Sequence, residues 1–127
     1  MSFEVLTQGS CITGIGRWSY TIEYRREMTE GELVHADSGD ETGTTDSQMK
    51  LMAILKALTY IRSINPVEPV IVRSDCPLCI KCITKKFDCT SDDAFKRNKV
   101  TRGFVQYLHE IWWKTGRLDV RFEIISP

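Results

Sequence analysis

The stretch Thr44-Thr45-Asp46-Ser47-Gln48-Met49-Lys50-Leu51-Met52-Ala53 opens the longest helical segment of the sequence. Thr45 and Gln48 have the spacing of a capping box, which satisfies the free amides of a first helical turn. Apolar residues then fall on one arc, which predicts that this helix packs against a sheet. Lys50 falls within the same arc, where an ammonium has to reach solvent or find an anion. The residues of the apolar arc are Leu51, Ile54, Leu55, Ala57, Leu58 and Ile61.

The segments on either side of this helix predict five strands and two more helices. Residues 17–25 alternate between apolar and polar side chains, as in a strand that is buried on one face. Gly39 and Gly43 predict a break after the third strand, and Val70-Ile71-Val72 is a run typical of a strand covered on both faces. The predicted strands are residues 3–7, 17–25, 32–37, 70–72 and 118–124; the further helices are residues 77–87 and a segment carrying Val100, Phe104, Leu108, Ile111 and Trp112, with a polar loop at 88–93.

This order of elements predicts an α/β fold with a mixed five-stranded sheet. Three antiparallel strands come first and strand–helix units follow, with helices on both faces of the sheet. A length of 127 residues with 42% hydrophobic residues fits a single domain over residues 1–127. Collagen-like, low-complexity and broadly disordered chains are excluded by the same composition.

Charge and cysteine content narrow the class of protein further. The net charge is zero, but 12 of the 17 basic residues lie in residues 61–127, which is where an anionic partner is expected. An odd number of cysteines and a start without a signal-peptide pattern predict a cytoplasmic, reduced protein. No stretch approaches the ~18 apolar residues that cross a bilayer, so no membrane partner is expected.

Three local motifs in this order resemble the ribonuclease H family over essentially the whole chain. Thr7-Gln8-Gly9-Ser10-Cys11, at the end of the first predicted strand, is similar to the family's T-D-G-S-C. Thr44–Ala53 is similar to T-T-N-N-R-M-E-L-M-A, and Ser74-Asp75 to the start of T-D-S, with Ile83-Thr84 at matching spacing in the next helix. The resemblance implies a ribonuclease H-like fold.

The family cuts the RNA strand of RNA–DNA hybrids with clustered carboxylates that hold Mg²⁺ ions. By resemblance, Asp75 is the one motif carboxylate that this sequence retains as a catalytic and metal-binding candidate, because Gln8 and Lys50 occupy the other two positions. The sequence ends at Pro127, where the family continues into a final helix with another Asp. The resemblance therefore indicates a divergent member with a degenerate active site and no C-terminal helix.

The same comparison suggests how the altered site is arranged. We expect the Lys50 ammonium to sit where a metal would, paired with Asp75, with the Gln8 carbonyl completing the arrangement. The family's contacts with the sugar-phosphate backbone map onto Ser10, Cys11, Thr45, Asp46 and Ser47. Helix N-termini and hydroxyls suit such contacts, although the Asp46 carboxylate would repel phosphate. The alternative is that Thr45 to Gln48 is simply a helix cap.

Other candidate residues have a simpler structural interpretation. Four cysteines have spacings that could belong to a zinc or iron–sulfur site: Cys76, Cys79, Cys82 and Cys89. The first three are predicted on one helix, where their side chains would spread around the helix surface rather than converge on a metal. A basic segment could follow a phosphate backbone. No nucleophilic triad is indicated for His35 or His109, and Trp112 and Trp113 fit core and rim positions. The basic residues are Lys81, Lys85, Lys86, Lys96, Arg97, Lys99 and Arg102.

We therefore predict a catalytically inactive ribonuclease H-like domain without a cofactor. It would bind structured nucleic acid, an RNA–DNA hybrid or double-stranded RNA, or act as an interaction module. One alternative is an active, Mg²⁺-dependent ribonuclease H whose missing ligands come from Asp37, Asp40, Asp46 or another chain. Another is a pure protein-interaction domain that self-associates through an edge strand or the helix with Trp112 and Trp113.

Overall fold

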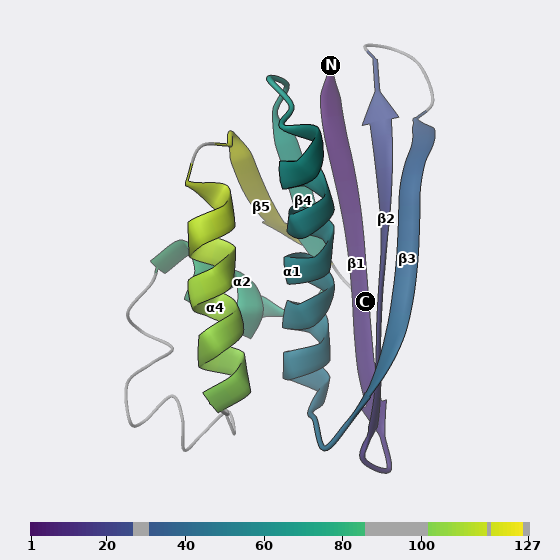
Figure 1. The fold of residues 1–127 in the computed structure, drawn as a ribbon, viewed down its shortest axis with the longest axis vertical. Helices are drawn as coiled ribbons and strands as arrows, with labels where there is room; N and C mark the ends of the chain where they lie inside the picture. The colour runs from purple at the N-terminus through teal and green to yellow at the C-terminus, as the bar shows by residue number, and fades with distance from the viewer. Residues whose placement is uncertain (27–30, 86–101, 117, 126–127) are drawn as a thin grey trace.

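The structure is a computed structural model that describes residues 1–26, 31–85, 102–116 and 118–125. Its sheet has the strand order β3-β2-β1-β4-β5. The first three strands pair antiparallel, and β4 pairs in parallel with both β1 and β5. The predicted α/β class and mixed five-stranded sheet are confirmed (Figure 1). The elements are β1 (Ser2–Ile12), β2 (Ile15–Arg25), β3 (Glu32–Thr42), α1 (Asp46–Ile64), β4 (Val70–Ser74), α2 (Pro77–Lys85), α4 (Arg102–Thr115) and β5 (Val120–Ile124).

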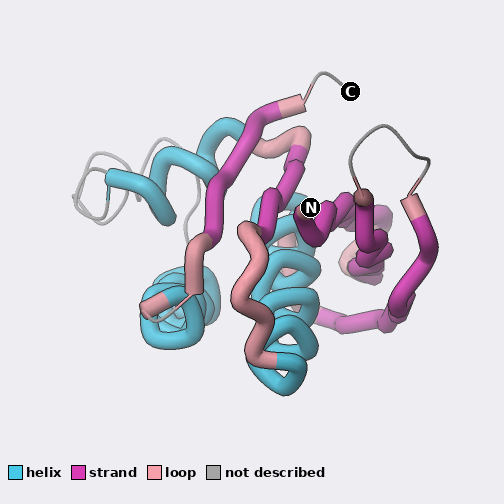
Figure 2. The backbone as a smooth tube through the Cα atoms, turned by 90° about the horizontal axis from the view of Figure 1, so that it is seen from above, coloured by secondary structure: helices cyan, strands magenta, loops and turns pink. Residues whose placement is uncertain are grey.

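Among the residues described, the helices lie on one face of the sheet, which differs from the predicted cover on both faces. Figure 2 shows α1 and α4 side by side on the same side of the strands. Trp112 of α4 donates through Nε1 to the carbonyl of Ile83 in α2 at 3.0 Å, which joins these two helices. The step from β3 through α1 to β4 and the step from β4 to β5 run in the same direction across the sheet, so two right-handed crossovers put their helices on the same face.

Helix α1 provides the centre of the core, as its apolar arc predicts. All six arc residues are buried. On the strand side, Phe3, Val5 and Thr7 of β1 are also buried, while Leu6, which points to the other face, is 40% exposed. At the start of α1 the approach to β1 is very close, because a Cβ atom on Gly9 would lie 2.4 Å from the backbone nitrogen of Lys50. Only glycine allows this contact, and the contact fixes the start of α1 against β1.

Strands β1 and β3 are longer than predicted. The hairpin after β1 turns at Thr13 and Gly14, both with positive φ, so the pairing continues up to Ile12 and Ile15. Gly39 does not break β3, because it lies over the Trp18 ring, where a Cβ atom would approach within 2.5 Å. The predicted ends of these strands at residues 7 and 37 were therefore wrong, whereas the Thr7–Cys11 motif does lie at the end of β1.

The helical predictions hold where the structure describes them. Thr45 caps α1, and its hydroxyl accepts from the backbone amide of Gln48 at 3.2 Å. In α4, Leu108 and Ile111 are buried. The predicted polar loop at 88–93 and Val100 lie outside the described residues. None of the helices described is both long and apolar enough to cross a membrane.

Candidate functional site

The centre of the candidate site is an ion pair between α1 and the end of β4. Lys50 Nζ lies 3.3 Å from Asp75 Oδ1, and the two side chains are 24% and 28% exposed. Asp75 directly follows β4, and the Gly9 contact brings the start of α1 to this end of the sheet. The predicted pairing of Lys50 with Asp75 is therefore confirmed, and it explains how a lysine is accommodated on the apolar arc.

The predicted contribution of Gln8 to this pair is not found. Gln8 is exposed, and the part of the chain that the structure describes shows no hydrogen bond between Gln8 and Lys50. Asp75 Oδ1 is buried and has no hydrogen-bond partner there either. The charge of Asp75 is thus balanced by the Lys50 ammonium at ion-pair distance, without a well-aligned hydrogen bond.

Gln8 and Asp75 instead share a polar cleft of about 630 Å³ on the sheet. Its floor is formed by two cross-strand rows. In the first row Gln8 lies opposite Ser19, which lies opposite Ser38. In the second row Ser10 lies opposite Arg17, which pairs with Asp40 at 3.3 Å. We refer to these six residues, Gln8, Ser10, Arg17, Ser19, Ser38 and Asp40, as the polar floor.

Sequence reasoning singled out Gln8, Ser10 and Asp40 but missed the other three residues of the polar floor, Arg17, Ser19 and Ser38. The alternation in residues 17–25 already placed Ser19 on the polar side of its strand. Its neighbours in space could not be identified, because they depend on the register between three strands. Arg17 and Asp40 are 78% and 65% exposed, so their ion pair contributes little stability and leaves both groups available to a ligand.

Of the five residues predicted to contact nucleic acid, Ser10 alone lines the cleft. Thr45 is occupied as the helix cap. Asp46 Oδ1 accepts a hydrogen bond from the backbone amide of Cys11, whose thiol donates to the carbonyl of Thr44 at 3.4 Å. The carbonyl of Ser47 accepts from the Cys79 thiol at 3.4 Å. These contacts tie the β1–β2 hairpin and α2 to the start of α1, so four of the five predicted residues hold elements together and do not line the cleft.

Next to Asp75, the first two cysteines of the four-cysteine pattern are in contact. Cys76 precedes α2 rather than lying on it, which corrects the prediction that the first three cysteines share one helix. The backbone amide of Cys79 donates to Cys76 Sγ at 3.4 Å. Hydrogen bonding by the Cys79 thiol, with help from the nearby Lys50 ammonium, lowers the pKa of Cys76 to about 7. The same thiol contact and burial raise the pKa of Cys79 above its usual value.

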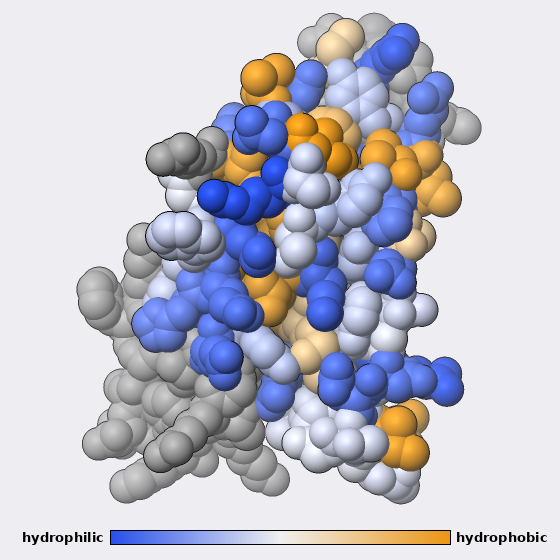
Figure 3. Space-filling model, viewed as in Figure 1, coloured by the Kyte–Doolittle hydropathy of each residue, from blue (hydrophilic) through white to orange (hydrophobic). Residues whose placement is uncertain are grey.

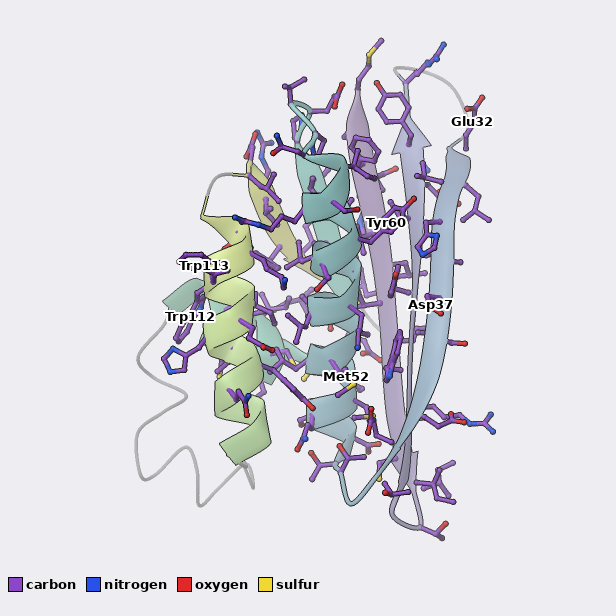
Figure 4. The ribbon with its side chains drawn as sticks, in the orientation of Figure 1. Glu32, Asp37, Met52, Tyr60, Trp112 and Trp113 are labelled. Atoms are coloured by element: carbon purple, nitrogen blue, oxygen red, sulfur yellow. The ribbon has the colours of Figure 1, made fainter. Side chains whose placement is uncertain are left out.

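The remaining candidates do not join the cleft. His35 stacks on Tyr60 at 3.9 Å between ring centroids, and His109 packs edge-on against Trp112 at 5.1 Å. Trp113 is 75% exposed on α4, away from the sheet (Figure 4). Of the basic segment, only Lys81 has a described side chain, and it is exposed on α2. Cys89 lies outside the described residues, as do Lys86, Lys96, Arg97 and Lys99.

The residues that the structure places at this end of the sheet do not fit Mg²⁺. Hard cations require several oxygen ligands with negative charge, whereas Gln8, Lys50 and Asp75 together sum to zero. The Lys50 ammonium lies 3.3 Å from Asp75 Oδ1 and already balances the charge of this carboxylate. Within the described ranges, no three His, Cys, Asp or Glu side chains are grouped to hold a metal.

The three carboxylates considered as substitute ligands each have another contact in the structure. Asp37 Oδ1 accepts from the amide of Ser38 at 2.8 Å, and its position on β3 is seen in Figure 4. Asp40 pairs with Arg17, and Asp46 binds the amide of Cys11. Asp40 is the one of these three that shares the cleft with Asp75.

Comparison with known proteins gives consistent results. The chain is 31% identical over 98 residues to a protein named Ribonuclease H from Campylobacter jejuni; the match spans 76% of this chain and 61% of that relative, so the chain covers less than two thirds of the relative's length. The N-terminal RNase H domain of a Mycobacterium tuberculosis protein superimposes with a TM-score of 0.79 at 6% identity, covering 100% of this chain and 88% of that one. LC11-RNase H1, solved in complex with an RNA/DNA hybrid, gives a TM-score of 0.70 at 18% identity, covering 98% and 85%. No protein-family model matches the chain.

Proposed function

The chain is a member of the ribonuclease H-like family, and on this premise we propose that it binds an RNA–DNA hybrid without cleaving it. The observation that carries the proposal is the ion pair between Lys50 and Asp75. Two-metal hydrolysis needs carboxylates that hold both ions and stabilise the attacking and leaving oxygens. One carboxylate that is already neutralised by an ammonium cannot do this.

The polar floor supports the proposal that the chain binds an RNA–DNA hybrid. Three serine hydroxyls and the Gln8 amide offer donors and acceptors to ribose 2′-hydroxyls and phosphate oxygens. Arg17 is exposed at the same place and can exchange its contact with Asp40 for a phosphate. The related fold of LC11-RNase H1 was solved with an RNA/DNA hybrid bound, which makes a hybrid the first ligand to test.

The experiment is fluorescence anisotropy of an end-labelled RNA–DNA hybrid, followed over time in low salt with Mg²⁺. We expect a stable rise that weakens as salt increases, because phosphate contacts release counterions. A progressive fall would mean cleavage and would favour the active, Mg²⁺-dependent alternative. A labelled double-stranded RNA in parallel shows whether the DNA strand is required.

A pair of matched variants tests whether the cleft is the binding surface. Ser38→Glu places a negative charge on the polar floor, whereas Ser63→Glu places the same charge on an exposed position near the end of α1. We expect Ser38→Glu to weaken binding about tenfold, or about 1.4 kcal/mol, and Ser63→Glu to leave it unchanged. Equal effects would show that the hybrid binds elsewhere.

No rise in anisotropy at all would favour the protein-interaction alternative. Its candidate surface is the outer edge of β3, where Leu33 is 64% exposed and no further strand is paired in the described sheet. Long exposed edge strands can pair with another chain. On the face carrying α1 and α4, hydrophobic residues lie in small groups among hydrophilic ones, so that face offers no comparable apolar surface among its coloured residues (Figure 3).

A further inference from the structure

The segment Cys76-Pro77-Leu78-Cys79 places two thiols at the start of α2. The Cys79 amide donates to Cys76 Sγ at 3.4 Å, and the amide of Ile80 donates to the Cys76 carbonyl at 3.2 Å. The two thiols also lie close enough to shift each other's pKa in opposite directions. Cys76 therefore caps the helix with its sulfur, and its sulfur faces that of Cys79.

We infer that Cys76 and Cys79 are a modification site, at which a hydroperoxide oxidises the two thiols to a reversible intrahelical disulfide. In the first step the deprotonated Cys76 sulfur attacks one peroxide oxygen; the O–O bond breaks, hydroxide leaves, and Cys76 becomes a sulfenic acid. In the second step the Cys79 sulfur attacks Cys76 Sγ, the S–O bond breaks, and water leaves. Overall, two thiols and one hydrogen peroxide become one disulfide and two waters.

The backbone at this point allows the bond to close. Helical residues three apart have Cβ atoms about 5–6 Å apart, whereas a disulfide needs about 3.5–4.5 Å. The gap can be closed at a helix start, because the first amides have no intrahelical carbonyl to hold them in place. Pro77 at the first helical position has no amide hydrogen to lose in this adjustment.

The burial of the two thiols determines which oxidant can reach them, and their position in α2 determines which cysteine pairs with Cys76. Cys76 is 6% exposed and Cys79 is fully buried, so a small peroxide reaches the pair more readily than a bulky disulfide does. Cys79 and Cys82 have the same spacing in sequence, but they lie further into α2, where closing the bond would disturb paired amides. Cys11 is held at the β1–β2 hairpin through its thiol contact with Thr44.

Oxidation also changes a contact between helices. The Cys79 thiol donates to the carbonyl of Ser47 in the first turn of α1. A disulfide sulfur has no hydrogen to donate, so this link between α2 and α1 is lost on oxidation and returns on reduction. The disulfide is therefore expected to loosen the start of α1 beside Lys50.

The test is mass spectrometry of the full chain after hydrogen peroxide, alkylation of free thiols and non-reducing trypsin digestion. Cleavage after Arg73 and Lys81 releases residues 74–81, which contain Cys76 and Cys79 and no other cysteine. We expect this peptide to be two hydrogen atoms lighter and unalkylated, and a dithiol reductant to restore both thiols. Residues 82–85 contain Cys82 alone and should remain alkylated, which makes them the internal control.

Two variants separate the proposed site from general oxidation. In Cys79→Ser, Cys76 should stop at the sulfenic acid, which a dimedone probe traps, whereas Cys82→Ser should oxidise like the unmodified chain. The proposal is overturned if residues 74–81 stay fully alkylated, or if Cys76 is found cross-linked to Cys11, Cys82 or Cys89 instead. Because the unmodified chain supplies the decisive peptide, a variant that fails to fold does not affect the result.

Discussion

Replacing Lys50 with methionine should destabilise the protein by leaving a carboxylate without its counter-charge. The Lys50 and Asp75 side chains are 24% and 28% exposed and lie 3.3 Å apart. Breaking a buried ion pair costs about 3–5 kcal/mol, whereas an exposed pair is worth about 0–1 kcal/mol. For this partly buried pair we expect a loss of about 2 kcal/mol, because solvent screens part of the Asp75 charge.

The assay is thermal denaturation followed by circular dichroism. For a chain of this length, about 2 kcal/mol corresponds to a fall in Tm of about 6–8 °C. Lys81→Met, which removes an exposed lysine from α2, is the matched control and should change stability by less than about 0.5 kcal/mol. The methionine preserves most of the apolar stem of Lys50, so the difference between the variants reports the charge.

The double variant Lys50→Met with Asp75→Asn decides whether the pairing argument is right. Removing the unpaired charge should recover at least about 1 kcal/mol relative to Lys50→Met alone, because no carboxylate is then left without a partner. Unchanged stability in Lys50→Met, or a further loss in the double variant, would refute the pairing. If Lys50→Met does not fold, rescue by Asp75→Asn remains a readable outcome.

Three further predictions concern the metal chemistry, the helix cap and the thiol. Gln8→Asp combined with Lys50→Glu should create a Mg²⁺ site beside the native Asp75, detected by calorimetry. No Mg²⁺ binding by this variant would mean that the charge of these two positions is not what prevents metal binding here. Thr45→Ala should lower the urea-derived stability by about 1 kcal/mol, and an unchanged midpoint would contradict the cap. Cys76, which faces Cys79, Lys50 and Asp75, has a lowered pKa, so its alkylation should reach half its maximum near pH 7 and fall away below it; a midpoint near 9 would contradict this.

Local sequence patterns predicted the parts of the fold that depend on neighbours along the chain. The cap at Thr45 and the apolar arc of α1 were correct, because both follow from hydrogen bonds and periodicity within a few residues. The predicted length of β3 was wrong, because glycine usually interrupts strands. Gly39 continues this strand because it lies over the Trp18 ring. The position of Cys76 before α2, rather than on it, likewise depends on where the helix actually begins.

By itself the sequence determined the α/β class, the motif order and the replacement of two carboxylate positions by Gln8 and Lys50. Only the tertiary structure decided that Lys50 meets Asp75, that Gln8 joins Ser19 and Ser38 in one row, and that Cys76 faces Cys79. The physical reason is that periodicity assigns a side chain to a face, whereas strand register and the approach of α1 to Gly9 determine which side chains meet across that face.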